Sequence, residues 1–170
     1  MENNILAIDS SLSSTGYAVI NFNNEQVLLT GRIHTDSNED EDNRMFDITN
    51  KLITICKLYN IKDGCMEDQY HTVNASTTMK LSRLRGAIAY AFKENNYKLT
   101  YMMPSSIRKT FINNSKADKK AIAEEVQKLC INNPYVNLGE FNDNNCFKKN
   151  SDMYDAISIG IAYIRMEKKS

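Results

Sequence analysis

The chain has 170 residues, with 21 basic and 21 acidic side chains and therefore a net charge of zero. Its hydrophobic fraction of 42% and charged fraction of 25% are those of an ordinary globular protein, which excludes a disordered, collagen-like or disulfide-stapled chain. At this length we expect one domain over residues 1–170. No apolar run reaches the ~18 residues of a transmembrane helix, and we expect no signal peptide.

The cysteines predict a reducing environment. None of the four belongs to a Cys-x-x-Cys pair, and only two histidines could join them in a zinc site. We therefore expect free thiols and a cytoplasmic protein.

The net charge of zero conceals an uneven distribution along the chain. Residues 1–79 carry 12 acidic and 5 basic side chains, whereas residues 80–120 carry 10 basic and 2 acidic ones. A central basic block is typical of a surface that contacts phosphates. A solvated helix face would carry the same charges, so both interpretations stand at this point.

The pattern of apolar residues predicts an α/β protein. Three strands joined by polar turns open the chain, at residues 4–9, 17–22 and 26–33. Two further strands are predicted at 65–67 and 99–103. Helical periods indicate helices at 42–60, 75–95, after Pro104, at 117–130 and from near Asp152, with a polar loop over 132–150. This order predicts a mixed five-stranded sheet, three antiparallel strands followed by parallel ones, with helices on both faces.

Four carboxylates lie at the ends of these predicted elements. Asp9 and Glu67 each end a short strand, where burial of a carboxylate is costly unless a cation meets it. Asp152 and Asp155 lie three residues apart at the predicted start of the last helix and share one face. Structural alternatives exist, because Asp152 could be an N-cap and Asp155 an acid favoured by the helix dipole.

Taken together, the four acids indicate a magnesium site. Magnesium prefers hard oxygen ligands in octahedral geometry. Two such ions about 4 Å apart can bind one phosphodiester, with one ion activating water and the other stabilising the leaving oxygen. Carboxylates without a His or Cys cluster suit this chemistry better than zinc chemistry. We therefore expect two Mg²⁺ ions per site, with Mn²⁺ able to substitute.

Several motifs carry a resemblance to a known family. Residues 5–20, Ile-Leu-Ala-Ile-Asp-Ser-Ser-Leu-Ser-Ser-Thr-Gly-Tyr-Ala-Val-Ile, resemble the opening of the RuvC family of Holliday junction resolvases. Residues 152–156, Asp-Met-Tyr-Asp-Ala, match the terminal Asp-x-x-Asp-Ala signature of that family. Glu67 lies where the family has its second acid, and Lys119 falls on its lysine. Two departures are Ser10-Ser11 in place of Pro-Gly and Asp68 in place of Gln, which on a strand points away from Glu67.

The resemblance implies a ribonuclease H-like fold and Mg²⁺-dependent hydrolysis by a homodimer that cuts opposed strands of a four-way junction. It implies that the metal ligands are Asp9, Glu67, Asp152 and Asp155. Lys119, with Lys120 as a second candidate, would neutralise charge at the scissile phosphate. The expected DNA contacts are Lys80, Arg83, Arg85, Arg108, Lys109, Lys116 and Lys120. Of these, Arg83, Arg85, Arg108 and Lys109 would hold phosphates on the junction arms.

Two further expectations each have a structural alternative. Tyr70 could stack on an unpaired base at the crossover, or it could be an ordinary strand-end tyrosine. The helix at 75–95 carries small residues and is the candidate for the dimer contact, although a core helix would show the same pattern. The Asn-rich character suggests a phage-encoded relative, which would work in the host cytoplasm.

Three other functions compete with junction resolution. A related nuclease acting on forks, flaps or RNA–DNA hybrids would keep the acids but need no dimer. A sugar-kinase or actin-like ATP binder also has a phosphate loop after an Asp, but it needs a second lobe that 170 residues do not provide. A DNA-binding module without catalysis is disfavoured because all four acids are present.

Overall fold

The structure is a computed structural model that describes residues 3–68, 74–136 and 144–169. One five-stranded sheet has the order β3-β2-β1-β4-β5, with strands β1 (Asn4–Asp9), β2 (Ser14–Asn21), β3 (Val27–His34), β4 (Asp63–Glu67) and β5 (Lys98–Met102). The first three strands pair antiparallel, whereas β1 pairs parallel with β4 and β4 with β5. The predicted mixed α/β sheet is therefore confirmed.

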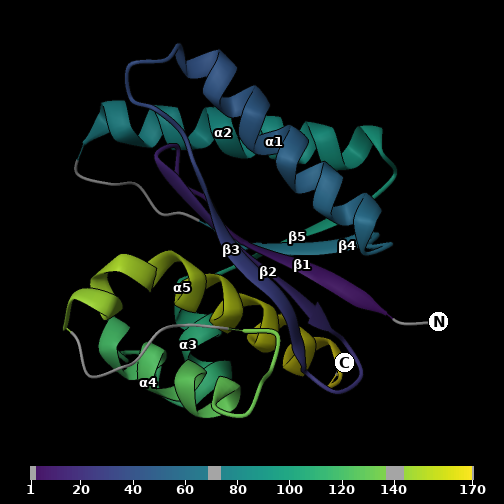
Figure 1. Ribbon diagram of the computed structural model, residues 1–170, viewed down its shortest axis with the longest axis vertical. Coiled ribbons are helices and arrows are strands. Elements are labelled where there is room, and N and C mark those ends of the chain that lie inside the picture. Colours follow the sequence, from purple (N-terminus) through teal and green to yellow (C-terminus); the bar gives the residue numbers. More distant parts are fainter. Residues whose placement is uncertain (1–2, 69–73, 137–143, 170) are drawn as a thin grey trace.

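Two layers of helices cover the sheet (Figure 1). One face carries α1 (Glu41–Leu58) and α2 (Ala75–Glu94), and the other carries α3 (Pro104–Ile112), α4 (Lys119–Cys130) and α5 (Asn144–Glu167). Strand β1 is buried on both faces, because Leu6 and Ile8 pack under α1 and α2 while Ile5 and Ala7 pack under the other three helices. Because both faces of this strand are buried, successive residues are apolar, which explains the continuous apolar run in the sequence.

Local sequence signals explain where several helices begin. Asp40 accepts hydrogen bonds from the backbone N–H groups of two residues in the first turn of α1, and Asn74 does the same for α2. Pro104 lies in the first turn of α3, where no intrahelical N–H is required. Asp118 caps α4, which makes Lys119 its first residue.

The last helix begins earlier than the sequence predicts. Helix α5 starts at Asn144, so the predicted loop over 132–150 is wrong for its last part, and Asp152 lies inside the helix and not at its N-cap. Asn is only moderately unfavourable in a helix. Packing on the sheet supports the long helix, since Tyr154, Ile157 and Ile161 are fully or almost fully buried.

Helix α5 lies directly against β2. A Cβ atom built on Gly16 would be 2.1 Å from the backbone oxygen of Asp152, so only glycine permits this approach. Gly16 is also the partner of Asp9 in the β1–β2 register. Asp152 is thereby held over the strand that neighbours Asp9.

Cys56, Cys65 and Cys130 are free and buried, as expected, whereas the side chain of Cys146 lies outside the described part of the chain. Among the helices that are described, none is long and apolar enough to cross a membrane.

Candidate active site

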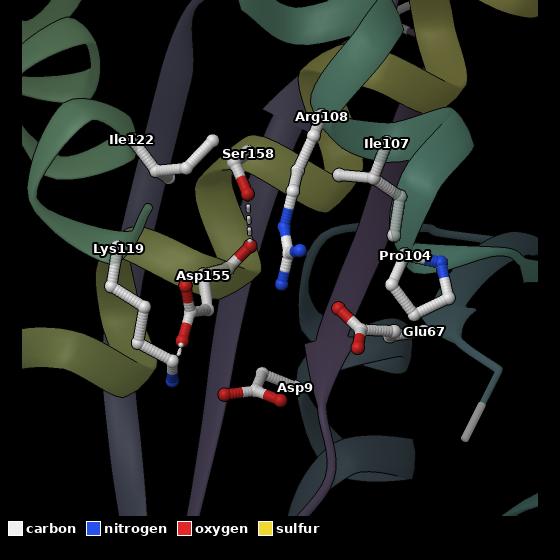
Figure 2. Close-up of a pocket in the computed structure, with 9 residues that line it drawn as sticks. All are labelled: Asp9, Glu67, Pro104, Ile107, Arg108, Lys119, Ile122, Asp155 and Ser158. Atoms are coloured by element: carbon white, nitrogen blue, oxygen red, sulfur yellow. Dashed lines mark hydrogen bonds and ion pairs between the residues drawn. The ribbon is translucent and has the colours of Figure 1, made fainter. Parts of the chain in front are cut away.

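An acidic cavity of about 80 Å³ opens where β1 and β4 end, between the sheet and helices α3, α4 and α5 (Figure 2). Because β1 and β4 are parallel neighbours, their last residues, Asp9 and Glu67, meet at the same edge of the sheet. Asp155 reaches the cavity from α5. The full lining is Asp9, Glu67, Pro104, Ile107, Arg108, Lys119, Ile122, Asp155 and Ser158. The structure thus brings together three of the four predicted acids.

Two cations share the cavity with these acids. The Lys119 ammonium lies 2.8 Å from Oδ2 of Asp155 and belongs to the first turn of α4. The Arg108 guanidinium descends from α3 toward the space between Asp155 and Glu67, as Figure 2 shows. The Ser158 hydroxyl donates to the backbone oxygen of Asp155 at 2.8 Å, one turn along α5.

Burial and like charges make ionisation of the acids unfavourable. Burial, and then the negative charges of Asp155 and Glu67, raise the pKa of Asp9 from 3.8 to about 8, against the opposing charge of Lys119. The pKa of Glu67 is also raised, first by burial and then by Asp155, while Arg108 and Lys119 act in the opposite direction. The two basic side chains therefore do not fully compensate the carboxylates, and the cavity favours an additional cation.

Lys119 stays positively charged in this setting. Burial disfavours its ammonium, but the hydrogen bond and charge of Asp155, together with the charges of Asp9 and Glu67, outweigh that effect and raise its pKa. A fixed positive group therefore lies beside the acids over the whole physiological pH range.

Asp152 lies beside the cavity and does not line it. Its carboxylate accepts a hydrogen bond from the Ser14 hydroxyl at 2.5 Å. Its charge raises the pKa of Asp9 less than the charges of Asp155 and Glu67 do. Its other carboxylate oxygen accepts from the neighbouring Ser151 hydroxyl at 3.3 Å. The Asp152 carboxylate is thus hydrogen-bonded to β2 and to its own helix, whereas that of Asp155 pairs with Lys119.

The carboxylate oxygens of the predicted ligands are chemically suited to a divalent ion, although they do not converge on one point as the ligands of a bound metal do. Within residues 3–68, 74–136 and 144–169, no group of three or more Asp, Glu, His or Cys side chains is placed to hold a metal ion. Like charges repel one another, and Lys119 draws Asp155 toward itself. The oxygen ligands present are those that Mg²⁺ prefers, and a bound ion would require them to converge. The metal-ligand roles stay predictions.

The predicted DNA contacts occupy different surroundings. Arg108 lies inside the acidic cavity, closer to the expected chemistry than a contact on a junction arm. Lys116 and Lys120 are exposed before and at the start of α4, and the Lys120 side chain is 73% exposed.

Two other predicted contacts lie away from this cavity or cannot be placed. Lys109 lines a separate cavity of about 460 Å³ together with Lys169. Tyr70 lies outside the described residues.

The basic residues of α2 also differ among themselves. Lys80, which is partly exposed, forms an ion pair with Glu41 of α1, while the exposed Arg83 lies 3.9 Å from the same carboxylate. Arg85 pairs with Asp68, and its guanidinium lies 5.0 Å from the centre of the Tyr101 ring. Arg85 therefore anchors the residue that follows Glu67 to α2, and its phosphate contact stays a prediction.

Fold and site together define the class of protein. The mixed five-stranded sheet with helices on both faces is the ribonuclease H-like fold, and its acids meet at the ends of the central strands. Residues 5–137 match the family model described as crossover junction endodeoxyribonuclease RuvC. The chain belongs to the RuvC family. The matched range includes Asp9, Glu67 and Lys119, whereas Asp152 and Asp155 lie beyond its end.

Individual relatives agree with this membership. The chain is 30% identical over 124 residues to the crossover junction endodeoxyribonuclease RuvC of Prochlorococcus marinus, covering 72% of this chain and 78% of the relative. It is 24% identical over 161 residues to that of Caldanaerobacter subterraneus, covering 94% and 90%. A solved structure of T. thermophilus RuvC in complex with Holliday junction substrate superposes with a TM-score of 0.79 at 14% identity, covering 99% of this chain and 96% of that chain.

Sequence reasoning missed two parts of the site. The position of Arg108 among the acids depends on how α3 packs, and only its basic character was visible. The contact between Ser14 and Asp152 joins residues far apart in the chain. One of several serines in a turn gives no signal of such a contact.

The ion pair of Arg85 yields a test on α2. Arg85→Ala should lower the free energy of unfolding by roughly 1–2 kcal/mol, because it leaves Asp68 without its partner at a half-buried position. Arg83→Ala, on the same helix but exposed, should change it by less than about 0.5 kcal/mol. Urea unfolding followed by circular dichroism measures both variants. Equal effects would contradict the structural role of Arg85.

The raised pKa of Asp9 predicts how stability depends on pH without metal. The folded state binds a proton on Asp9 between pH 3.8 and about 8 that the unfolded chain releases. Stability in EDTA should therefore fall as pH rises through this window. Asp9→Asn should flatten the slope in part, since Glu67 contributes in the same direction.

Melting temperatures from pH 5 to 9 test this prediction. Added Mg²⁺ should reduce the loss at high pH, because a divalent cation stabilises the ionised carboxylates. A melting temperature of the EDTA-treated protein that rises over the window would contradict the burial of uncompensated acids.

Proposed function

We propose that this protein is a Holliday junction resolvase. It is a divalent-metal-dependent endonuclease that hydrolyses phosphodiester bonds at four-way DNA junctions by paired, symmetric nicks made by a homodimer. The observation that carries the proposal is the meeting of Asp9, Glu67 and Asp155 in one cavity with Arg108 and Lys119, in a chain of the RuvC family. The names of the relatives, and the junction bound to T. thermophilus RuvC, support the same activity.

The residues of the cavity, and Asp152 beside it, have distinct roles in this proposal. Asp9, Glu67, Asp152 and Asp155 hold two Mg²⁺ ions, or Mn²⁺ in their place. When bound, such ions supply an activated water and stabilise the leaving oxygen. Lys119 holds Asp155 and keeps a positive charge where charge develops on the scissile phosphate.

Arg108 acts on the phosphate itself in this scheme. Its guanidinium can donate two parallel hydrogen bonds to phosphate oxygens, which fixes orientation as well as charge. Its place between Asp155 and Glu67 supports a contact with the phosphate that is cut. The exposed lysines near α4 and the basic residues of α2 bind neighbouring phosphates without reading sequence.

Helix α2 supports a contact between two copies. Its residues Leu84 and Ile88 are buried in the core of their own chain, so they are not available to a partner. Met79 and Tyr90 are 58% and 69% exposed, and the Cβ position of Gly86 faces open space. These three residues lie on one side of the helix by their spacing. They form the surface through which we expect the homodimer to assemble.

The direct test uses a labelled four-way junction. Cleavage should occur in Mg²⁺ or Mn²⁺ and not in EDTA, at symmetric positions on opposed strands, while a linear duplex stays intact. Equal cutting of forks, flaps or RNA–DNA hybrids would assign the protein to a less selective nuclease of the same fold. A monomer in sedimentation that still makes paired nicks would remove the dimer from the proposal.

Asp9→Asn separates catalysis from binding. The substitution removes the charge of a proposed metal ligand and leaves the basic surface unchanged, so cleavage should be lost while the junction is still retained in a gel shift in EDTA. Asp47→Asn, an exposed acid on α1, is the matched control and should cut normally. Cleavage by the Asp9 variant at the wild-type rate would exclude Asp9 as a metal ligand.

Lys119 and Lys120 are adjacent but should act differently. Lys119→Ala should lower single-turnover cleavage roughly 100-fold with little change in junction affinity, since it removes a charge that stabilises the transition state. Lys120→Ala should weaken binding and leave the rate at saturating protein nearly unchanged, as expected for an exposed phosphate contact. Unchanged turnover in the Lys119 variant would reject its transition-state role.

A further inference from the structure

Strand β2 contacts Asp152 at two residues, Ser14 and Gly16. Ser14, the first residue of β2, donates its hydroxyl to Oδ2 of Asp152 at 2.5 Å. Gly16, two residues further on the same face, allows the backbone oxygen of Asp152 to approach the strand. The main chain of Asp152 therefore lies against β2 and its carboxylate is hydrogen-bonded to β2, although the residue belongs to α5.

This anchoring sets where the carboxylate lies relative to the other acids. Gly16 pairs with Asp9 across the β1–β2 ladder, so a residue seated over Gly16 is beside Asp9. Asp152 does not line the cavity, and its side chain could turn away toward solvent on a free helix surface. The Ser14 hydroxyl opposes this rotation, because a hydroxyl that donates to a carboxylate forms a stronger hydrogen bond than two neutral groups do.

We infer that Ser14 is a positioning residue that orients Asp152 as a metal ligand. The inference rests on the proposed function, which makes Asp152 one of the four ligands. Oδ2 accepts the Ser14 hydroxyl proton, and Oδ1 accepts the hydroxyl of the neighbouring Ser151 at 3.3 Å. Each carboxylate oxygen has a second lone pair, which keeps its capacity for a cation. Groups that hydrogen-bond to a ligating carboxylate typically change metal affinity 10- to 100-fold when they are removed.

The neighbouring serines provide a matched comparison. Ser13 is exposed, and its hydroxyl lies 3.4 Å from that of Ser11. Ser13→Ala therefore removes a hydroxyl from the same segment without touching Asp152. Ser14→Thr keeps a hydroxyl and suits a strand, so it should retain the bond that Ser14→Ala loses.

The experiment is a calorimetric titration of the DNA-free protein with Mn²⁺. Ser14→Ala should weaken Mn²⁺ binding roughly 10-fold, whereas Ser14→Thr and Ser13→Ala should bind like the wild type. In junction cleavage, Ser14→Ala should need more Mg²⁺ for half-maximal rate yet approach the wild-type rate at saturation. Its melting temperature in EDTA should stay close to that of the wild type.

A double-mutant cycle shows whether Ser14 acts through Asp152. In the Asp152→Asn background, Ser14→Ala should have little further effect on Mn²⁺ affinity. Full additivity, unchanged Mn²⁺ affinity of Ser14→Ala, or failure of Ser14→Thr to restore binding would each overturn the inference. So would a wild-type protein that binds no Mn²⁺.

The titration contains no DNA, so it separates this inference from the proposed function. A protein that shows the Ser14 pattern with Mn²⁺ but cuts no junction would keep the positioning role and lose the resolvase assignment.

Discussion

The repulsion among carboxylates gathered at one edge of the sheet is the constraint on which the rest of the site depends. Parallel pairing of β1 and β4 forces Asp9 and Glu67 to the same edge, and α5 adds Asp155. Burial removes the water that would screen them, which explains why the pKa of Asp9 is raised to about 8. Such an arrangement lowers stability in the metal-free state, and bound cations would compensate the charges of the carboxylates.

The surrounding fold keeps these groups in place against that repulsion. Strand β1 is packed on both faces and cannot shift without disturbing two hydrophobic clusters. On the α5 side, Gly16 brings β2 against the backbone of Asp152. On the α2 side, Arg85 pairs with Asp68, the residue that follows β4, while Glu67, the last residue of β4, lines the cavity. The site is built on strands and helices packed from both sides, which limits its freedom to relax.

Much of this arrangement could be predicted from the sequence because it depends on local signals. Asp9 and Glu67 end apolar strands, and the mixed sheet of three antiparallel strands followed by parallel ones follows from the turns and helical periods. The start of α5 at Asn144 could not be predicted, since the residues before Asp152 are largely polar and the burial that supports the helix comes later, at Tyr154 and Ile157. Arg85 and Arg108 were indistinguishable as basic residues in the sequence. Their different surroundings arise from which face of each helix meets the sheet.

In the folded protein, the basic residues of the central block fall into two groups, those that line the acidic cavity and those that are exposed to solvent. Arg108 and Lys119 line the cavity and oppose the acids, Lys119 through its ammonium paired with Asp155 although its side chain is 66% exposed, which keeps the cavity from becoming still more negative. Lys116 and Lys120 stay exposed near the same helix start, where they meet solvent and any approaching phosphate. A polyanion drawn to the exposed lysines would therefore arrive beside a cavity that requires cations. A net charge of zero is compatible with strong local fields of both signs, because the fold places acidic and basic side chains in different regions of the molecule.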